Sequence, residues 1–207
     1  MQKKKPRKFF EFGSYHILQV KKTDTYKKEK WKFFVLPPLF GQRSSENWEV
    51  IYQLIAVCDS DTAFINLVIP ITTVTHTPGF FSKKDETSSS HIDSIFAVLK
   101  ISNDTIPWTI RAGKFWFNQN IAGLLRYNND EYAIEGEDRF QGNEKAKLGP
   151  FPKGIIVKDK TGKQLGAIQF RKKFYSWLSK DLAAPLKLAI ATTLSLVLST
   201  LESIGSN

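Results

Sequence analysis

The chain has 207 residues, of which 42% are hydrophobic and 24% charged, and its formal net charge is +10 at pH 7. This composition is ordinary for a globular protein, so it excludes a wholly disordered chain and allows one sizeable domain. The single cysteine, Cys58, excludes an intramolecular disulfide and a cysteine metal cluster, and it fits a reducing compartment.

The first forty residues are predicted to hold a basic tail followed by short strands. Residues 1–8 form the tail, which we expect to be mobile. Residues 9–20 alternate well enough to predict a strand. Residues 21–32 are rich in lysine and predict a solvated loop or a hairpin edge, whereas the apolar residues 31–40 predict a strand that ends at two prolines.

The next fifty residues give weaker signals. Residues 44–57 fit two patterns, because their apolar side chains share one helical face but are also strand formers, and we favour a helix. Residues 64–74 predict a strand in which Pro70 marks a bend or an edge. Residues 77–93 are polar, with a serine run, and predict a surface loop.

From residue 95 onward, short apolar runs alternate with turn signals, which is typical of an antiparallel sheet closing as a barrel or sandwich. Asn128-Asn129-Asp130 is predicted to be one of these turns. The clearest hairpin spans residues 155–170, because Gly162 can supply a positive φ between two runs of β formers.

The last stretch, residues 181–202, predicts a helix that is apolar on every face. Asp181 is expected to cap its start, Pro185 to lie in its opening turn and Gly205 to come after its end. Such a helix must be covered on all sides, by protein or by lipid. Its uncharged run is roughly fourteen residues, shorter than the ~20 of a membrane span, so we favour a buried core helix over a tail anchor.

These elements predict a mainly β (α+β) protein with one domain. No linker divides residues 9–207, and the central helix is expected at about residues 182–202. The N-terminus is basic, but Glu11, His16 and Gln19 interrupt the apolar residues behind it, so we predict no signal peptide.

The order of short strands, final hairpin and terminal apolar helix resembles the tubby C-terminal-like superfamily, which includes tubby domains, phospholipid scramblases and LURP-one-related proteins. The resemblance covers residues 145–202, which match the pattern of strand, Asp-x-x-Gly turn, two strands and helix. It implies an antiparallel β barrel closed around a hydrophobic C-terminal helix.

The resemblance also implies a lipid site. Tubby domains bind phosphoinositides through a Lys-x-Arg pair shortly before a strand that ends in Tyr-Asp. Here Lys145-Ala146-Lys147 precedes a strand that ends in Lys158-Asp159, so Lys145 and Lys147 are the implied site residues, although lysine replaces the bidentate arginine. Residues 171–177 are basic and aromatic where scramblases carry an acidic calcium-linked segment, so neither a calcium site nor scrambling is implied.

The residues themselves predict binding to anions. Basic groups occur near residues 3–8, 21–32 and 145–163, and the predicted lipid-binding cations are Lys145, Lys147, Lys158, Arg171, Lys172 and Lys173. Such clusters suit an anionic leaflet, and nucleic acid is the alternative partner. The simplest alternative is that the lysines only solvate loops. Four aromatic residues could sit at a lipid interface, but we expect them in the sheet core: Trp31, Trp116, Tyr175 and Trp177.

No nucleophile with its base, phosphate loop or histidine pair at ligand spacing is evident in the sequence. We therefore predict a non-catalytic monomer without cofactor or metal, cytoplasmic or peripheral at a membrane, that binds acidic phospholipid. The competing hypotheses are a nucleic-acid-binding domain, a tail-anchored membrane protein, and an interaction protein whose charge only aids solubility.

Overall fold

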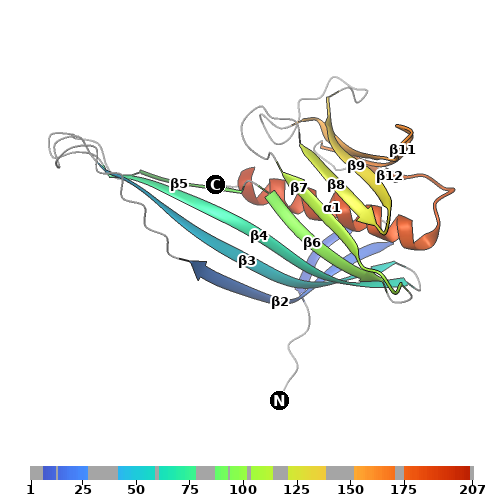
Figure 1. Cartoon of the computed structure of the whole chain (residues 1–207), viewed down its shortest axis with the longest axis horizontal. Helices are drawn as coiled ribbons and strands as arrows, with labels where there is room; N and C mark the ends of the chain where they lie inside the picture. Colours follow the sequence, from blue (N-terminus) through green and yellow to red (C-terminus); the bar gives the residue numbers. More distant parts are fainter. Residues whose placement is uncertain are drawn as a thin grey trace, which may run out of the picture.

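The computed structural model describes residues 7–12, 14–27, 42–58, 61–77, 87–92, 94–101, 104–113, 121–138, 152–170 and 175–205 (Figure 1). Its elements, in chain order, are β1 (Arg7–Phe12), β2 (Tyr15–Lys27), β3 (Gln42–Cys58), β4 (Asp61–Thr77), β5 (Thr87–Ile92), β6 (Ser94–Ile101), β7 (Trp108–Gly113), β8 (Ala122–Tyr127), β9 (Asp130–Glu137), β10 (Gly154–Lys158), β11 (Gln164–Gln169), β12 (Tyr175–Leu178) and α1 (Ala184–Gly205).

The described strands form one antiparallel sheet. Strands adjacent in the chain are neighbours from β1 to β4 and from β6 to β12, while β5 and β6 both pair with β4. The predicted mainly β fold with one C-terminal helix is confirmed. Strands β1 and β12 are the two ends of the sheet, and among the described residues no hydrogen bonds join them to close a barrel.

The terminal helix lies against the concave side of this sheet (Figure 1). Helix α1 contacts β1, β2 and β3 near one end of the sheet and β10, β11 and β12 near the other. Side chains from Leu188 to Leu201 are buried, apart from the half-buried Ser199. The segment Ala184–Leu201 is long and apolar enough to cross a membrane, but 72% of it is buried within the protein. The prediction of a buried core helix is confirmed.

The hydroxyl groups of this helix are accommodated by local bonds. Thr193, Ser195, Ser199 and Thr200 each donate to the carbonyl four residues earlier, at 2.8 to 2.9 Å. These bonds satisfy the hydroxyl donors without a partner on the sheet. Thr192 differs, because its Oγ1 is buried and has no hydrogen-bond partner among the described residues.

The expected cap of the helix is wrong. The helix begins at Ala184, and the Lys187 N–H donates to the Ala183 carbonyl at 2.9 Å. A helix capped by Asp181 would place Pro185 where its N–H should bond the Asp181 carbonyl, and the proline ring would clash there. With Ala183 as the cap, Pro185 is the second helical residue and needs no such bond. Gly205 ends the helix.

The predicted helix over residues 44–57 is also wrong, because this segment is strand β3. It pairs with β4 along its whole length, from Gln42 opposite Thr77 to Cys58 opposite Asp61, and with β2 on its other side. Alternate side chains, including Val50 and Leu54, are buried. The segment is rich in strand-forming residues, and a partner strand on each side stabilises the strand over the helix.

Two other segments differ from expectation, and a third matches one of its two predicted alternatives. The single strand predicted over residues 9–20 is a hairpin of β1 and β2, in which Phe12 pairs with Tyr15. Residues 21–27, predicted to be a solvated loop or a hairpin edge, continue β2 and pair with β3 on one side only, so the hairpin edge is confirmed. The serine run expected in a loop forms β5, which pairs with β4. The strand predicted over residues 31–40 lies outside the described residues.

The predicted bend or edge at Pro70 coincides with a change of partner strand. Strand β4 pairs with β6 up to Val68 and with β5 from Ile71 onward. Proline has no N–H to donate, so it fits a position between these two ladders. Figure 1 shows one end of β2, β3 and β4 extending together with β5 beyond α1.

The short strands predicted after residue 95 are confirmed where they are described, and so are the turns at Asn128-Asn129-Asp130 and Gly162, whereas Ala112-Gly113 and Glu135-Gly136, also predicted as turns, lie in β7 and β9. Strands β10 and β11 form the predicted hairpin, and Gly162 has a φ of +83°. Asn128 has a φ of 53° in the turn between β8 and β9. The left-handed conformation suits glycine and asparagine best, so both turns follow from local chemistry.

The buried hydroxyl of Thr192 gives a test of the packing around α1. We expect Thr192→Val to raise the free energy of unfolding by about 1 kcal/mol, because it removes an unsatisfied buried group and keeps the shape. Urea unfolding followed by circular dichroism measures the change. Thr193→Val is the matched control, because it removes a hydroxyl bonded to the Ala189 carbonyl. A loss of stability in Thr192→Val equal to that of the control would contradict this account.

Candidate functional site

Most of the cations that the sequence nominates for lipid binding lie outside the described residues. Lys145 and Lys147 fall within residues 139–151, and Arg171, Lys172 and Lys173 fall within residues 171–174. Of the nominated residues, Lys158 alone is described. The grouping of these cations into one site therefore stays a prediction from the sequence.

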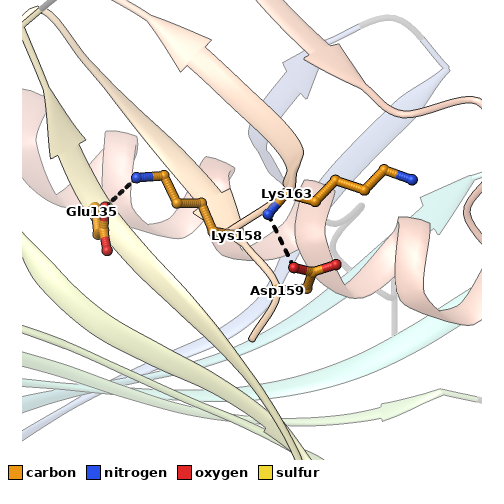
Figure 2. A network of polar contacts seen from close by, with 4 residues as sticks. All are labelled: Glu135, Lys158, Asp159 and Lys163. Atoms are coloured by element: carbon orange, nitrogen blue, oxygen red, sulfur yellow. Dashed lines mark hydrogen bonds and ion pairs between the residues drawn. The ribbon is translucent and has the colours of Figure 1, made fainter. Parts of the chain in front are cut away.

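Lys158 lies at the end of β10 and is held by a carboxylate (Figure 2). Its Nζ donates to Glu135 Oε2 on the neighbouring strand β9 at 2.6 Å, and the side chains are 24% and 48% exposed, respectively. An exposed ion pair of this kind contributes little stability. The pair nevertheless compensates the charge of Lys158, so an anionic headgroup would have to compete with Glu135 for it.

The turn after Lys158 is built around Asp159, whose carboxylate is shown with Lys163 in Figure 2. Asp159 Oδ1 accepts the hydroxyl of Thr161 at 2.6 Å and the backbone N–H groups of Thr161 and Lys163 at 2.8 and 3.0 Å. The Thr161 hydroxyl is the largest cause of the lowered pKa of Asp159, which the two N–H groups and the charge of Lys163 reinforce. The turn presents Lys160 and Lys163 to solvent.

Strand β12 carries two exposed aromatic side chains. Tyr175 is 57% exposed and Trp177 is 43% exposed. They are separated by one residue, so they lie on the same face of the strand. Strand β12 pairs with β11 and ends the described sheet, and it comes shortly after the basic residues 171–173 in the chain.

The expectation that Tyr175 and Trp177 belong to the sheet core is therefore wrong. A core side chain needs cover, and β12 is a four-residue strand at the end of the sheet whose aromatic residues remain exposed. The sequence held one signal for exposure, because the apolar segment Tyr175–Leu178 is short and follows the three cations at residues 171–173. Trp31 and Trp116 lie outside the described residues.

Other aromatic residues are packed, which sets Tyr175 and Trp177 apart. Trp108 is 3% exposed, donates through Nε1 to Asp104 Oδ2 at 2.7 Å, and stacks on Tyr127 with ring centroids 4.3 Å apart. Tyr132 belongs to the same stack, and burial is the first cause of its raised pKa. This cluster is structural, because its rings pack on one another and the indole N–H has a partner within the fold.

Metal ligation and thiol chemistry depend on histidine, cysteine and acidic side chains. No group of three or more histidine, cysteine, aspartate or glutamate residues lies close enough to hold a metal ion in the described ranges. The Cys58 thiol is buried, and its Sγ lies 3.6 Å from Ser14 Oγ. The described surface carries exposed cations, such as Lys160 and Lys163, and the exposed rings of Tyr175 and Trp177.

Comparisons with protein-family models, with curated proteins and with solved structures find no match for this chain. The resemblance to the tubby C-terminal-like superfamily stays a prediction from the order of the elements.

The Asp159 turn gives a prediction for acid titration. Its folded pKa is lowered, so its contribution to stability is present above the ordinary value of 3.8 and is lost as the pH falls through the folded pKa. We expect a carboxyl carbon titration by NMR to place the midpoint of Asp159 below 3.8. In Thr161→Val, which lacks the donating hydroxyl, the midpoint should move back toward that value. Equal midpoints in the two proteins would show that the hydroxyl bond does not set the pKa.

Proposed function

We propose that this protein is a non-catalytic module that binds acidic phospholipid at a membrane surface. The observation that carries the proposal is the exposure of Tyr175 and Trp177 shortly after Arg171, Lys172 and Lys173. Tyrosine and tryptophan side chains favour the membrane interface, where their rings meet apolar groups and their polar atoms stay wet. Adjacent cations would contact the anionic headgroups.

The charge of the chain supports this mode of binding. The formal net charge is +10, and each lysine or arginine near an anionic leaflet contributes about 1 kcal/mol. Lys145 and Lys147 would add to the cations before β12, whereas Lys158 is held by Glu135. Several cations acting together are sufficient to keep a soluble domain at a membrane surface.

The proposed attachment is peripheral. Helix α1 is the one helix among the described residues that could span a membrane, and its apolar surface is occupied by the sheet. Strands β1 and β12 both contact α1, which supports a barrel whose remaining seam lies between these two strands.

The proposal predicts that binding depends on particular cations and not on total charge. We expect Lys145→Gln/Lys147→Gln to weaken sedimentation with phosphatidylserine-containing vesicles by about tenfold or more, because two headgroup contacts are lost. Ser88→Glu/Ser89→Glu is the matched control: these two exposed β5 residues give the same change of −2 in net charge. Equal weakening in both variants would reduce the interaction to non-specific charge, and no weakening in the lysine variant would remove these residues from the site.

Parallel assays on the same protein distinguish the competing functions. Strong binding to duplex DNA or RNA without binding to anionic vesicles would favour the nucleic-acid alternative. Retention on membranes after a carbonate wash would favour a tail anchor, and deletion of residues 188–201 would then release a folded domain. The buried position of α1 leads us to expect that this deletion unfolds the protein instead.

A further inference from the structure

A second surface of the sheet exposes apolar side chains, and it lies on strands other than β12. In β4 and β6, alternate residues such as Ile65 and Leu99 are buried in the core. The residues between them point to the opposite face. There Phe64, Phe96 and Val98 are 56%, 41% and 44% exposed.

The strand register brings these side chains together. Val68 pairs with Phe96, and Asn66 pairs with Val98. On the other side of β4, the partly exposed residues of β3 extend the apolar area, because Ile51 pairs with Val68 and Ile55 with Phe64. Directly paired residues on one face have neighbouring side chains. We name this surface the outer-face patch: Ile51, Ile55, Phe64, Val68, Phe96 and Val98.

Cations border the outer-face patch. Lys100 is paired with Phe64, and Arg111 is paired with Phe96 and lies over its ring, with 5.3 Å from Cζ to the centroid. Lys21 on β2 lies across the sheet from Val98, because Lys21 pairs with Gln53, Gln53 with Asn66, and Asn66 with Val98. All three cations are exposed, and none forms an ion pair with a carboxylate within the described part of the chain.

Two carboxylates farther along the sheet are already engaged, whereas Glu49 lies on the same face of β3 as Ile51, two residues away. Glu131 on β9 accepts from Arg126 at 2.7 Å, and Glu135 accepts from Lys158 at 2.6 Å. The cations beside the apolar side chains therefore keep their charge available, whereas Arg126 and Lys158 are compensated. The outer-face patch therefore combines exposed apolar side chains, with Gln53 and Asn66 between them, and a border that carries three cations and the carboxylate of Glu49.

The charge pattern selects the occupant. A second copy docked by a two-fold axis would place this net positive surface against itself, where like charges repel. An anionic bilayer satisfies both parts, because apolar side chains enter the acyl boundary while cations contact the headgroups. We propose that the outer-face patch is a second membrane-contact surface, which inserts Phe64, Phe96 and Val98 into an anionic leaflet. This inference rests on the proposed function.

A fluorescent reporter tests insertion directly. Cys58 is buried, so a thiol-reactive, polarity-sensitive dye on Val98→Cys would label the exposed position selectively. We expect a blue shift with vesicles of phosphatidylcholine and phosphatidylserine and none with phosphatidylcholine alone. The same dye on Ser88→Cys, an exposed position of β5, should not shift with either vesicle.

Two double variants test the border and the centre of the patch separately. We expect each of two double variants to weaken vesicle binding by about tenfold or more: Lys100→Gln/Arg111→Gln at the border and Phe64→Ser/Phe96→Ser at the centre. Ser88→Glu/Ser89→Glu is the control for the first variant, because it makes the same change in net charge. Urea unfolding of each variant verifies that the fold is retained, and the charge variant preserves the test if the serine variant does not fold.

The outcomes separate this inference from the proposed function. If the wild-type chain binds anionic vesicles but the dye on residue 98 does not shift and both variants bind normally, the inference is overturned and the proposed function stands. If the wild-type chain does not bind anionic vesicles, both are overturned. A concentration-dependent dimer by light scattering that Phe96→Ser abolishes would overturn the inference by identifying a second copy as the occupant.

Discussion

The structure depends on the need to cover a helix that is apolar on all sides. Leu196, Val197 and Leu198 are consecutive, so their side chains point about 100° apart around α1, and each is fully buried. A flat sheet would cover one stripe of such a helix. Here the helix contacts strands from both ends of a curved sheet, so its other sides are covered as well. Because only the inner face of the sheet meets the helix, buried and exposed residues alternate along β6 and the adjoining part of β4.

Because the helix takes up the concave face, the outside of the sheet is where this protein meets its surroundings. There the charges are of two kinds. Some, such as Lys158 and Arg126, are compensated by carboxylates on the neighbouring strand, and others, such as Lys100 and Arg111, are not in ion pairs within the described residues. Exposed apolar and aromatic residues accompany the second kind and the basic segment before β12. The proposed lipid binding rests on this pairing of apolar surface with available positive charge.

The errors made from the sequence have a common origin in competition between local patterns and partners. Residues 44–57 carry an apolar stripe at helical spacing, but the same residues also alternate, and two long neighbouring strands stabilise the alternating conformation. Asp181 is a good capping residue by type, but Pro185 determines where the helix can begin. The serine run of β5 has no apolar alternation to reveal it, and pairing with β4 alone makes it a strand.

The sequence by itself determined the elements whose cause is local or compositional. The uncharged, all-round apolar run required burial, and Gly162 and Asn128 marked turns because few residues accept a positive φ. Tertiary structure decided what depends on neighbours distant in the chain: that β3 is a strand, that Glu135 holds Lys158, and that Tyr175, Trp177 and Phe96 remain exposed. The partners Glu135 and Lys158 are 23 residues apart in the chain and meet only through strand register. Exposure likewise depends on whether another element of the fold covers the strand.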